Sequence, residues 1–475
     1  MRLGRLKVAC CALALAVACG KEAELGPAPL GPIRLPTGLA VDGQGRLLVA
    51  SSNADLLYAE STGGTVTVLN PLDPTLLSTD SIDLVSVIPV RSFAGDLAFA
   101  RTEPWGAPVP DAEACGAASD LPIPIDFPLA VFGTRGSNTL NVLFENPTTG
   151  QVSCAAPGAC SIPVGTGYAD PLPVTIACGG GRARAFVGYL TSAGLAAWVG
   201  ELDLETLALQ NFWVGNGPIR GFAYDRDRDR LYMVGLATGT PTPLRWIDLG
   251  NCTPGAAPGA GGCRIGSATF PTLPPGLELR SIAFAHSATP GLARPAGLPL
   301  RAYLTARIYD PTSAATAGGR TTEFGSLLIV ADLVEDAMGG VTPQVVASFP
   351  LGLGAQDVRV LPRAPGWATS RRDVVAALTV TDGALWIYDD EGGAPPAAFR
   401  QCSTPEACSP VTGAPILGHE PYGLAIDPAV AGATARLWVG SFADSFVTPI
   451  DVTLDPQVVA TFAGGFHHKI SGPTP

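Results

Sequence analysis

The stretch PTGLAVD at residues 36–42 returns almost unchanged as PYGLAID at residues 421–427, near the other end of the chain. Shorter stretches between them follow a related plan, a small residue set among apolar ones: GDLAF at 95–99, PVTIA at 173–177, GFAYD at 221–225, SIAFA at 281–285 and QDVRV at 356–360. Seven copies of one short pattern indicate a repeat architecture, in which a small structural unit recurs along the chain.

Two further apolar stretches follow each copy, and a more polar one comes fourth. The second stretches are RLLVAS at 46–51, LAVFGT at 129–134, AFVGYL at 185–190, RLYMVG at 230–235, RAYLTA at 301–306, DVVAAL at 373–378 and RLWVGS at 436–441. Short strands repeated in this way predict an all-β fold, a β-propeller of seven four-stranded blades over residues 33–465. Small residues suit the first strand of each blade, because these strands crowd around the central axis. A count of six or eight blades stays open, because blades two and three match the pattern least.

Three short motifs carry a resemblance to a known class of protein: P-x-G-L-A-[VI]-D, then R-L-[LYW]-[VM], then Ile-Asp at the end of the third strand. The chain resembles the NHL and YVTN-type propellers, most clearly in blades one, four and seven. Its repeats are longer than is usual there. We expect insertions at 102–127, 251–275, 287–300 and 308–324 to absorb the difference as loops rich in Pro, Gly and Ala.

Composition excludes several classes of protein. The 475 residues include 57 Gly and 45 Pro, which argues against long helices and coiled coils. Hydrophobic residues make up 47% and charged residues only 15%, which argues against a disordered chain. The net charge of −12 is a poor match to nucleic acid, which basic patches bind.

The N-terminus predicts export. Arg2, Arg5 and Lys7 precede an apolar run at residues 8–18, which is typical of a signal peptide and too short to span a bilayer as a helix. The following LAVAC at 15–19 resembles the lipobox of bacterial lipoproteins, which implies cleavage after residue 18 and lipidation of Cys19. An ordinary cleaved signal peptide is the alternative. The predicted divisions are 1–18 signal peptide, 19–32 lipidated Cys and tether, 33–465 propeller and 466–475 tail.

The residue after the lipidated cysteine and the cysteine count both bear on location. Gly20 follows Cys19, and in families with the usual sorting rule this favours the outer membrane of a Gram-negative bacterium. Without the leader, eight further cysteines remain, and an even number in an exported protein suggests disulfides. Three pairs are close in sequence and are expected to bond: Cys154–Cys160, Cys252–Cys263 and Cys402–Cys408. Cys115 and Cys178 are the two cysteines that remain, and they form the fourth predicted pair. No zinc-type spacing occurs, so no metal site is predicted.

Candidate functional residues gather where the inner strand of each blade begins. Loops and strand starts on this face supply Arg34, Arg91, Asp96, Arg220, Arg280, Asp357, His419, Glu420 and Tyr422, and loops between second and third strands add Arg135, Arg307 and Asp444. Arginines that converge on one channel mouth would hold a carboxylate or phosphate group, because guanidinium pairs with both oxygens of such groups. The plainer interpretation is that these arginines pair with neighbouring carboxylates. The predicted binding set at the mouth is Arg91, Arg220, Arg280, His419, Glu420 and Tyr422.

Two functions from different classes follow from these residues. The first is a lipid-anchored binding or scaffolding module of the cell envelope, with an envelope protein or extracellular polymer as partner, and no cofactor, nucleic acid or catalytic residue. The alternative is a periplasmic lactonase-like or other hydrolase, with a divalent metal or an acid–base pair such as His419 and Glu420 at the channel mouth. An enzyme would gather three or more polar side chains from different blades around one point, with shifted pKa values. A scaffold would instead expose an apolar or aromatic patch.

Overall fold

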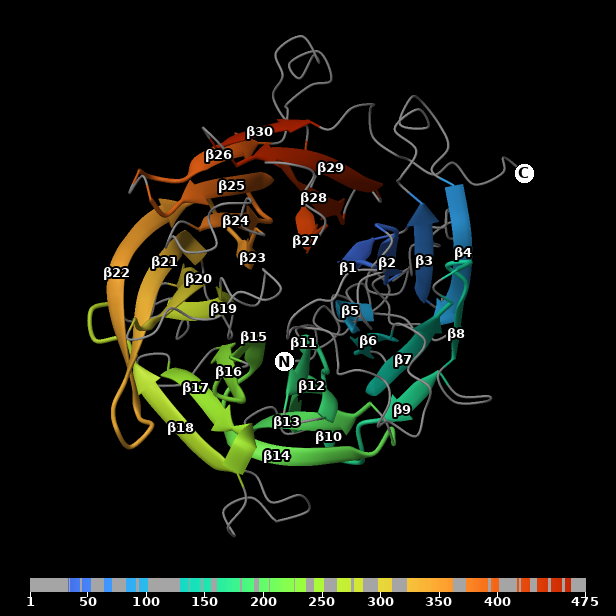
Figure 1. Ribbon diagram of the computed structural model, residues 1–475, viewed down its shortest axis with the longest axis horizontal. Helices are drawn as coiled ribbons and strands as arrows, with labels where there is room; N and C mark the ends of the chain where they lie inside the picture. The colour runs from blue at the N-terminus through green and yellow to red at the C-terminus, as the bar shows by residue number, and fades with distance from the viewer. Residues whose placement is uncertain are drawn as a thin grey trace, which may run out of the picture.

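The computed structural model describes the propeller between residues 33 and 462, with gaps. The residues outside it are 1–32, 34, 43–44, 53–63, 71–82, 91–93, 101–128, 136, 147, 155–159, 180–181, 192–195, 205, 226, 236–242, 252–262, 275–276, 285–297, 310–322, 362–372, 392–393, 401–416, 418–419, 428–433, 443–445, 455–457 and 463–475. Within the described part the strands form seven antiparallel sheets arranged as a seven-bladed β-propeller, which confirms the predicted fold (Figure 1).

The first three blades lie between residues 36 and 216. Blade one contains β1 (Pro36–Val41), β2 (Leu47–Ser51), β3 (Gly64–Asn70) and β4 (Asp83–Val90). Blade two contains β5 (Ala94–Ala100), β6 (Leu129–Thr134), β7 (Thr139–Glu145), β8 (Val152–Cys154) and β9 (Ser161–Pro163). Blade three contains β10 (Tyr168–Ala169), β11 (Val174–Gly179), β12 (Arg182–Thr191), β13 (Ala196–Asp203) and β14 (Leu209–Asn216).

The remaining four blades each have four strands. Blade four contains β15 (Ile219–Asp225), β16 (Arg230–Gly235), β17 (Pro243–Asp248) and β18 (Arg264–Thr269), with the 3₁₀ turn η2 (Leu249–Asn251). Blade five contains β19 (Leu277–Phe284), β20 (Leu300–Tyr309), β21 (Glu323–Glu335) and β22 (Val341–Leu351). Blade six contains β23 (Ala355–Val360), β24 (Val374–Thr379), β25 (Ala384–Asp389) and β26 (Ala397–Arg400), and blade seven contains β27 (Pro421–Ile426), β28 (Thr434–Ser441), β29 (Phe446–Thr453) and β30 (Val459–Phe462).

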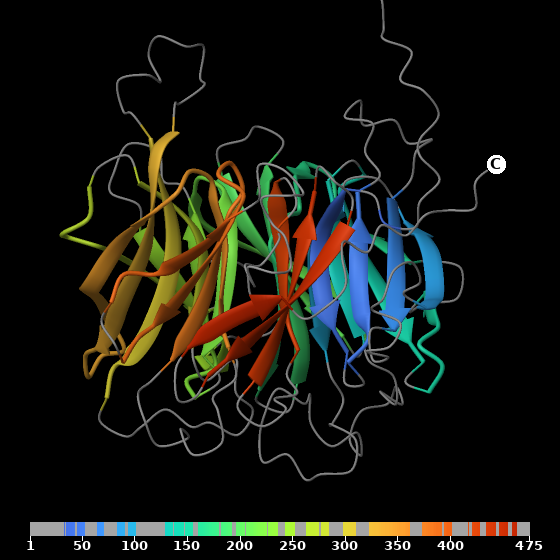
Figure 2. The same ribbon diagram turned by 90° about the horizontal axis from the view of Figure 1, so that it is seen from above.

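The hydrophobic core is divided among the seven seams between neighbouring blades. Each cluster of buried apolar side chains draws its members from two adjacent blades. The inner strands β1, β5, β11, β15, β19, β23 and β27 contact their neighbours around the ring, and Figure 2 shows the blades from the side, with their strands running between the two faces. The second strands of the blades, such as β2 and β16, therefore bury both of their faces, which explains their continuous apolar runs, whereas outer strands such as β18 and β22 are partly exposed.

The ring closes by side-chain packing between blades seven and one. All the strands of blade one come from residues 36–90, and those of blade seven from residues 421–462, so the described blades exchange no strand. At this seam Trp438 and Ala425 pack with Leu39 and Val41. The two near-identical stretches at 36–42 and 421–427 thus lie side by side as β1 and β27.

The small residue in the inner strands is required by close packing. A Cβ atom on Gly38 would lie 2.7 Å from the carbonyl oxygen of Gly95, on the next inner strand. On Gly221 it would lie 2.9 Å from the carbonyl oxygen of Arg280. Both contacts are shorter than side chains tolerate, which confirms that the strands crowd around the axis.

The Arg and Ile-Asp motifs form ion pairs within blades. Arg230 at the start of a second strand pairs with Asp248 at the end of the third, and the Nε of Arg436 lies 2.8 Å from Asp451 in the same relation. Four second-strand arginines also reach a carboxylate of the following blade: Arg46 to Glu145, Arg184 to Asp229, Arg230 to Glu335 and Arg301 to Asp390. The repeated motif therefore ties both strands and blades together.

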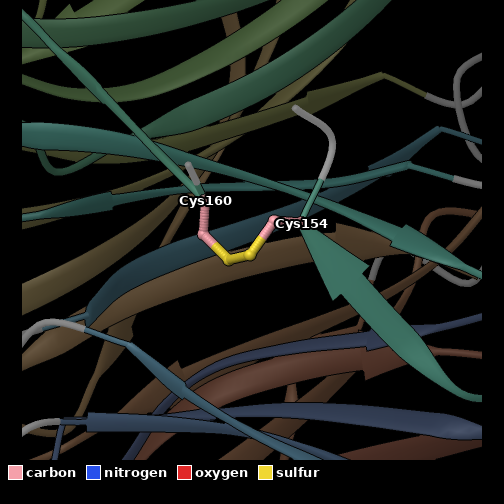
Figure 3. Close-up of a disulfide and its surroundings, with 2 residues drawn as sticks. All are labelled: Cys154 and Cys160. Atoms are coloured by element: carbon pink, nitrogen blue, oxygen red, sulfur yellow. A yellow bond between two sulfur atoms is a disulfide. The ribbon is translucent and has the colours of Figure 1, made fainter. Parts of the chain in front are cut away.

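One of the predicted disulfides is present within the described residues. Cys154 and Cys160 are bonded and join the ends of β8 and β9, two short strands that both pair with β7 (Figure 3). Cys263 is also disulfide-bonded, while its predicted partner Cys252 lies outside the described residues. Cys178 lies in β11, and Cys115, Cys402 and Cys408 lie outside the description, as does Cys19.

Parts of three predicted insertions are wrong: the ends of 287–300 and 308–324 belong to β20 and β21, and β18 lies inside 251–275. Residues 251–275 were expected to form a loop, but β18 occupies 264–269 and pairs along its length with β17. Its sequence, RIGSAT, contains three small residues and resembles the loop sequence around it. Most of its side chains are exposed at the rim of the blade, so no apolar pattern marks it as a strand. Blades two and three, the least clear in sequence, each carry an additional short strand.

Among the described residues, no helix is long and apolar enough to cross a membrane.

Candidate functional site

Six of the seven inner strands carry a β-bulge close to their beginning. The extra residue is Thr37 in β1, Arg220 in β15, Arg280 in β19 and Tyr422 in β27, and it falls within 95–96 in β5 and 356–357 in β23. A bulge bends its strand and re-aims a side chain, and bulges are common next to functional sites. In these strands it lies where the innermost, unpaired edge lines the channel.

An ion pair crosses this channel. The guanidinium of Arg359 in blade six lies 3.8 Å from a carboxylate oxygen of Asp96 in blade two. Three blades separate these two on one side of the ring and two on the other, so their side chains meet only across the centre. About a third of each side chain is exposed (33% for Arg359 and 39% for Asp96), so water reaches the pair.

Two more residues complete this channel cluster, which we define as Asp96, Ser281, Asp357 and Arg359. Arg359 lies 3.1 Å from Asp357, and the Ser281 hydroxyl donates a 2.9 Å hydrogen bond to the same carboxylate. The four side chains come from β5, β19 and β23, and therefore from three blades. Three blades thus place polar groups around one point.

The ionisation of the channel cluster is unusual. The pKa of Asp96 is raised to about 6, mainly by burial inside the ring and also by the charge of Asp357, while the charge of Arg359 opposes the rise. Burial lowers the pKa of Arg359, but the charges of Asp357 and Asp96 outweigh burial and the pKa is raised. Arg359 therefore stays charged, while Asp96 changes its protonation state close to neutral pH.

A second group of charges lies at the channel mouth, and we call it the mouth cluster: Arg220, Glu278, Arg280, Arg307 and Gln356. Glu278 accepts hydrogen bonds from Arg220 Nε (3.0 Å) and Arg280 (3.1 Å). Gln356 accepts from Arg280 (2.7 Å) and Arg307 (3.0 Å). Burial would raise the pKa of Glu278, but the charges of Arg280 and Arg220 outweigh it and the pKa is lowered, so Glu278 is ionised.

The structure brings together only some of the predicted residues. Arg220 and Arg280 meet at Glu278, which agrees in part with the plainer interpretation that these arginines pair with carboxylates. Arg135 pairs instead with Asp170, away from the mouth cluster. Tyr422 occupies the bulge of β27, with its ring centroid 6.0 Å from that of Phe442.

The predicted pair of His419 and Glu420 is only partly within the described residues. Glu420 is exposed in a left-handed backbone conformation, and its carbonyl accepts a hydrogen bond from the amide of Phe442. His419 lies outside the description, together with Arg34, Arg91 and Asp444. The acid–base role considered for this pair stays a prediction.

A metal finds little support at the channel cluster. Within the described ranges no three His, Cys, Asp or Glu side chains lie close enough to hold a metal ion. A guanidinium already faces both carboxylates of the cluster, and its positive charge opposes a cation there. The chemistry that these four residues can offer is therefore proton transfer and hydrogen bonding.

Arg359 and Ser281 were missed by sequence reasoning. Arg359 is the fourth residue of QDVRV, where GDLAF has Ala98 and the other well-matched inner strands also have alanine at the small central position. A charged residue at a position where close packing otherwise selects alanine was the sequence feature that could have identified Arg359 as a functional residue. Nothing in the sequence placed it opposite Asp96.

No family model and no curated protein matches this chain. Among solved structures, hydrazine synthase from Kuenenia stuttgartiensis is similar, with a TM-score of 0.52 and 13% identity over 91% of this chain and 99% of that one. A putative 6-phosphogluconolactonase from Bacteroides fragilis (TM-score 0.45, 12% identity, 87% and 93% covered) and a periplasmic gluconolactonase from Pseudomonas aeruginosa (TM-score 0.39, 13% identity, 89% and 97% covered) are more distant in shape. At such identities the similarity shows the fold alone.

Proposed function

We propose that the protein is a lipid-anchored cell-envelope propeller that binds an anionic group of an envelope protein or extracellular polymer at the mouth of its channel. The observation that carries this proposal is the mouth cluster, in which Arg220 and Arg280 share the carboxylate of Glu278, while Arg307 bonds the neutral amide of Gln356. The next carboxylate, Glu323, lies 3.8 Å from Arg307. Among the described residues, three positive charges against two make this group locally basic in a protein of net charge −12.

One of these arginines keeps donors that a ligand can reach. Among the described residues Arg220 donates only through Nε, to Glu278, and 24% of its side chain is exposed. The Nε of Arg280 also has no hydrogen-bond partner in this part of the chain, but it is buried, so a ligand does not reach it. Guanidinium donors of this kind bind carboxylate or phosphate oxygens strongly, because the hydrogen bonds are charge-assisted.

The test is a calorimetric titration of the purified protein with inorganic phosphate and with polygalacturonate, an anionic polysaccharide. We expect Arg220→Met to weaken binding of the anion about tenfold, the value of one charge-assisted hydrogen bond. Arg436→Met is the matched control, because it removes an arginine that pairs with Asp451 in blade seven outside the mouth cluster. Equal affinity of the wild-type protein and Arg220→Met, or no binding of either probe, would refute the proposal.

The alternative, a hydrolase in the same channel, is favoured by a different observation. The channel cluster gathers polar groups from three blades, and one of them has a shifted pKa, as expected of an enzyme rather than a scaffold. A scaffold would expose an apolar or aromatic patch, and the described surface offers little sign of one. Its exposed large apolar side chains are spread over blades one, three, four and five.

A further inference from the structure

The channel cluster divides its two carboxylates between different tasks. Asp357 is held from two sides, by the Ser281 hydroxyl at 2.9 Å and by Arg359 at 3.1 Å, and it also accepts a hydrogen bond from the amide of Val358. Within the described part of the chain, Asp96 accepts a hydrogen bond only from the amide of Leu97 (3.1 Å), because 3.8 Å to Arg359 is too long for a hydrogen bond. Asp357 therefore fixes the position of Arg359, and Asp96 keeps acceptor capacity for another molecule.

From this geometry we infer that the channel cluster is a hydrolytic centre for carboxylic esters, open-chain or cyclic, with Asp96 as the general base and Arg359 as the stabiliser of the oxyanion. A water molecule gives a proton to the Asp96 carboxylate while its oxygen forms a bond to the ester carbonyl carbon. The carbonyl electrons move onto oxygen, where the Arg359 guanidinium donates hydrogen bonds. When the oxyanion collapses, the carbon–oxygen bond to the alcohol breaks, and the leaving oxygen takes the proton from Asp96.

Three features of the cluster fit this chemistry. Water reaches both groups, since 39% of the Asp96 side chain and 33% of the Arg359 side chain are exposed within a ring of buried strands. The pKa of Asp96 of about 6 leaves most of it ionised at neutral pH, yet basic enough to accept a proton. A guanidinium fixed beforehand by Asp357 needs no rearrangement when charge develops on the substrate, which is the condition for effective stabilisation.

The inference does not depend on the mouth cluster. Among the described residues, Arg220, Glu278 and Arg280 make no hydrogen bond to Asp96 or Arg359, and the contact of Arg280 with blade six is its hydrogen bond to Gln356. Binding of an anion at the mouth and hydrolysis in the channel can therefore be lost separately. Loss of phosphate binding in Arg220→Met with retained hydrolysis would support both ideas at once.

The experiment measures hydrolysis of 4-nitrophenyl acetate and dihydrocoumarin, an aryl ester and a cyclic aryl ester, by the purified full chain between pH 4.5 and 8.5. We expect a rate above that of buffer that rises with pH through a midpoint near 6, because the base must be deprotonated. Asp96→Asn is expected to lower the rate about 10²–10⁴-fold, the usual contribution of general acid–base catalysis. Asp451→Asn is the matched control, since it removes an arginine-paired carboxylate in blade seven and leaves the channel unchanged.

Arg359→Met provides a second readout that a merely structural role would not produce. The charge of Arg359 opposes the rise in the pKa of Asp96, so its removal is expected to move the pH midpoint upward as well as lower the rate. No hydrolysis of either probe above the buffer rate would overturn the inference. So would an unchanged rate in Asp96→Asn, or a pH midpoint that stays in place in Arg359→Met.

Discussion

Glu145 is a fully buried carboxyl group that shares one arginine with Asp42. Arg46 pairs with Asp42 within blade one and reaches Glu145 of blade two at 3.2 Å. The pKa of Glu145 is raised to about 9, mainly by burial and also by the charge of Asp42 and a hydrogen bond to it, against the opposing charge of Arg46. Glu145 is therefore protonated at neutral pH, which leaves one anion and one cation in the seam.

This proton makes the stability of the protein depend on pH. Glu145 ionises at about pH 4.3 in the unfolded chain and near 9 in the folded one, so the folded protein holds one more proton between these values. The contribution of Glu145 to the free energy of unfolding is fully present below about pH 4.3. It decreases as the pH rises toward 9, by up to about 1.4 kcal/mol per pH unit. We expect Glu145→Gln to flatten the dependence of the free energy of unfolding on pH between 5 and 9, as measured by urea denaturation.

Glu391→Gln serves as the control for this prediction, because Glu391 is exposed in a turn after β25. It should follow the wild-type curve at every pH. If Glu145→Gln and the wild-type protein show parallel curves, Glu145 carries no extra proton in the folded state.

At the scale of the element, the inner strand is the part of each blade with the least freedom. Its first few residues must pack closely against the next inner strand. The same residues must also direct a side chain toward the channel. The glycine of P-x-G-L-A serves the first purpose, and the bulge beside it serves the second. Both devices occur together in β15, where Gly221 follows the bulged Arg220.

Gly221→Ala tests how tightly the inner strands fit. The added Cβ would lie 2.9 Å from the Arg280 carbonyl oxygen and from the Ser281 Cα, which are backbone atoms that cannot turn aside. We expect a loss of about 1–3 kcal/mol in the free energy of unfolding, the usual cost of overpacking. Gly325→Ala in β21 is the control, since its Cβ would meet only Ile308 at 3.8 Å, and equal stability of the two variants would contradict the close fit.

Repetition identifies an element better than composition does. The inner and second strands were found because their patterns recur, whereas β18 was missed because RIGSAT lies among Gly, Pro and Ala residues and is mostly exposed. An outer strand has one neighbouring strand only and faces solvent at the rim, so burial does not select an apolar pattern there.

At the scale of the molecule, the ring is closed by a seam between the two ends of the propeller. Trp438 is fully buried there and packs with Leu39 and Leu47, nearly four hundred residues earlier in the chain. Each of the seven seams buries a cluster of apolar side chains. The stability of the fold and the formation of the channel therefore both depend on the packing of blade seven against blade one.

The attachment of this ring to a membrane stays a prediction from the first nineteen residues. We expect Cys19→Ser to abolish labelling with radioactive palmitate and to move the protein from the membrane fraction to the soluble exported fraction, because the lipid is the proposed anchor. Cys263→Ser, which removes a disulfide-bonded cysteine of the propeller, should keep its label. Unchanged labelling of Cys19→Ser would reject Cys19 as the lipidation site.

The sequence by itself determined the fold class and the place of most inner, second and third strands, because these depend on short patterns that recur along the chain. It favoured seven blades but left six or eight open, and the structure decided for seven. The sequence also placed Arg220 and Arg280 near the start of an inner strand, where the structure has both of them. It paired Cys154 with Cys160 because few residues separate them.

Only the tertiary structure brought Asp96 and Arg359 together. They belong to blades two and six, which share no seam, and they meet because a closed ring of seven blades places opposite inner strands across a narrow channel. A local pattern carries no information about which residue lies opposite another across the ring. The distance between Asp96 and Arg359 is set by the packing of all seven seams together, and this distance decides the chemistry of the site.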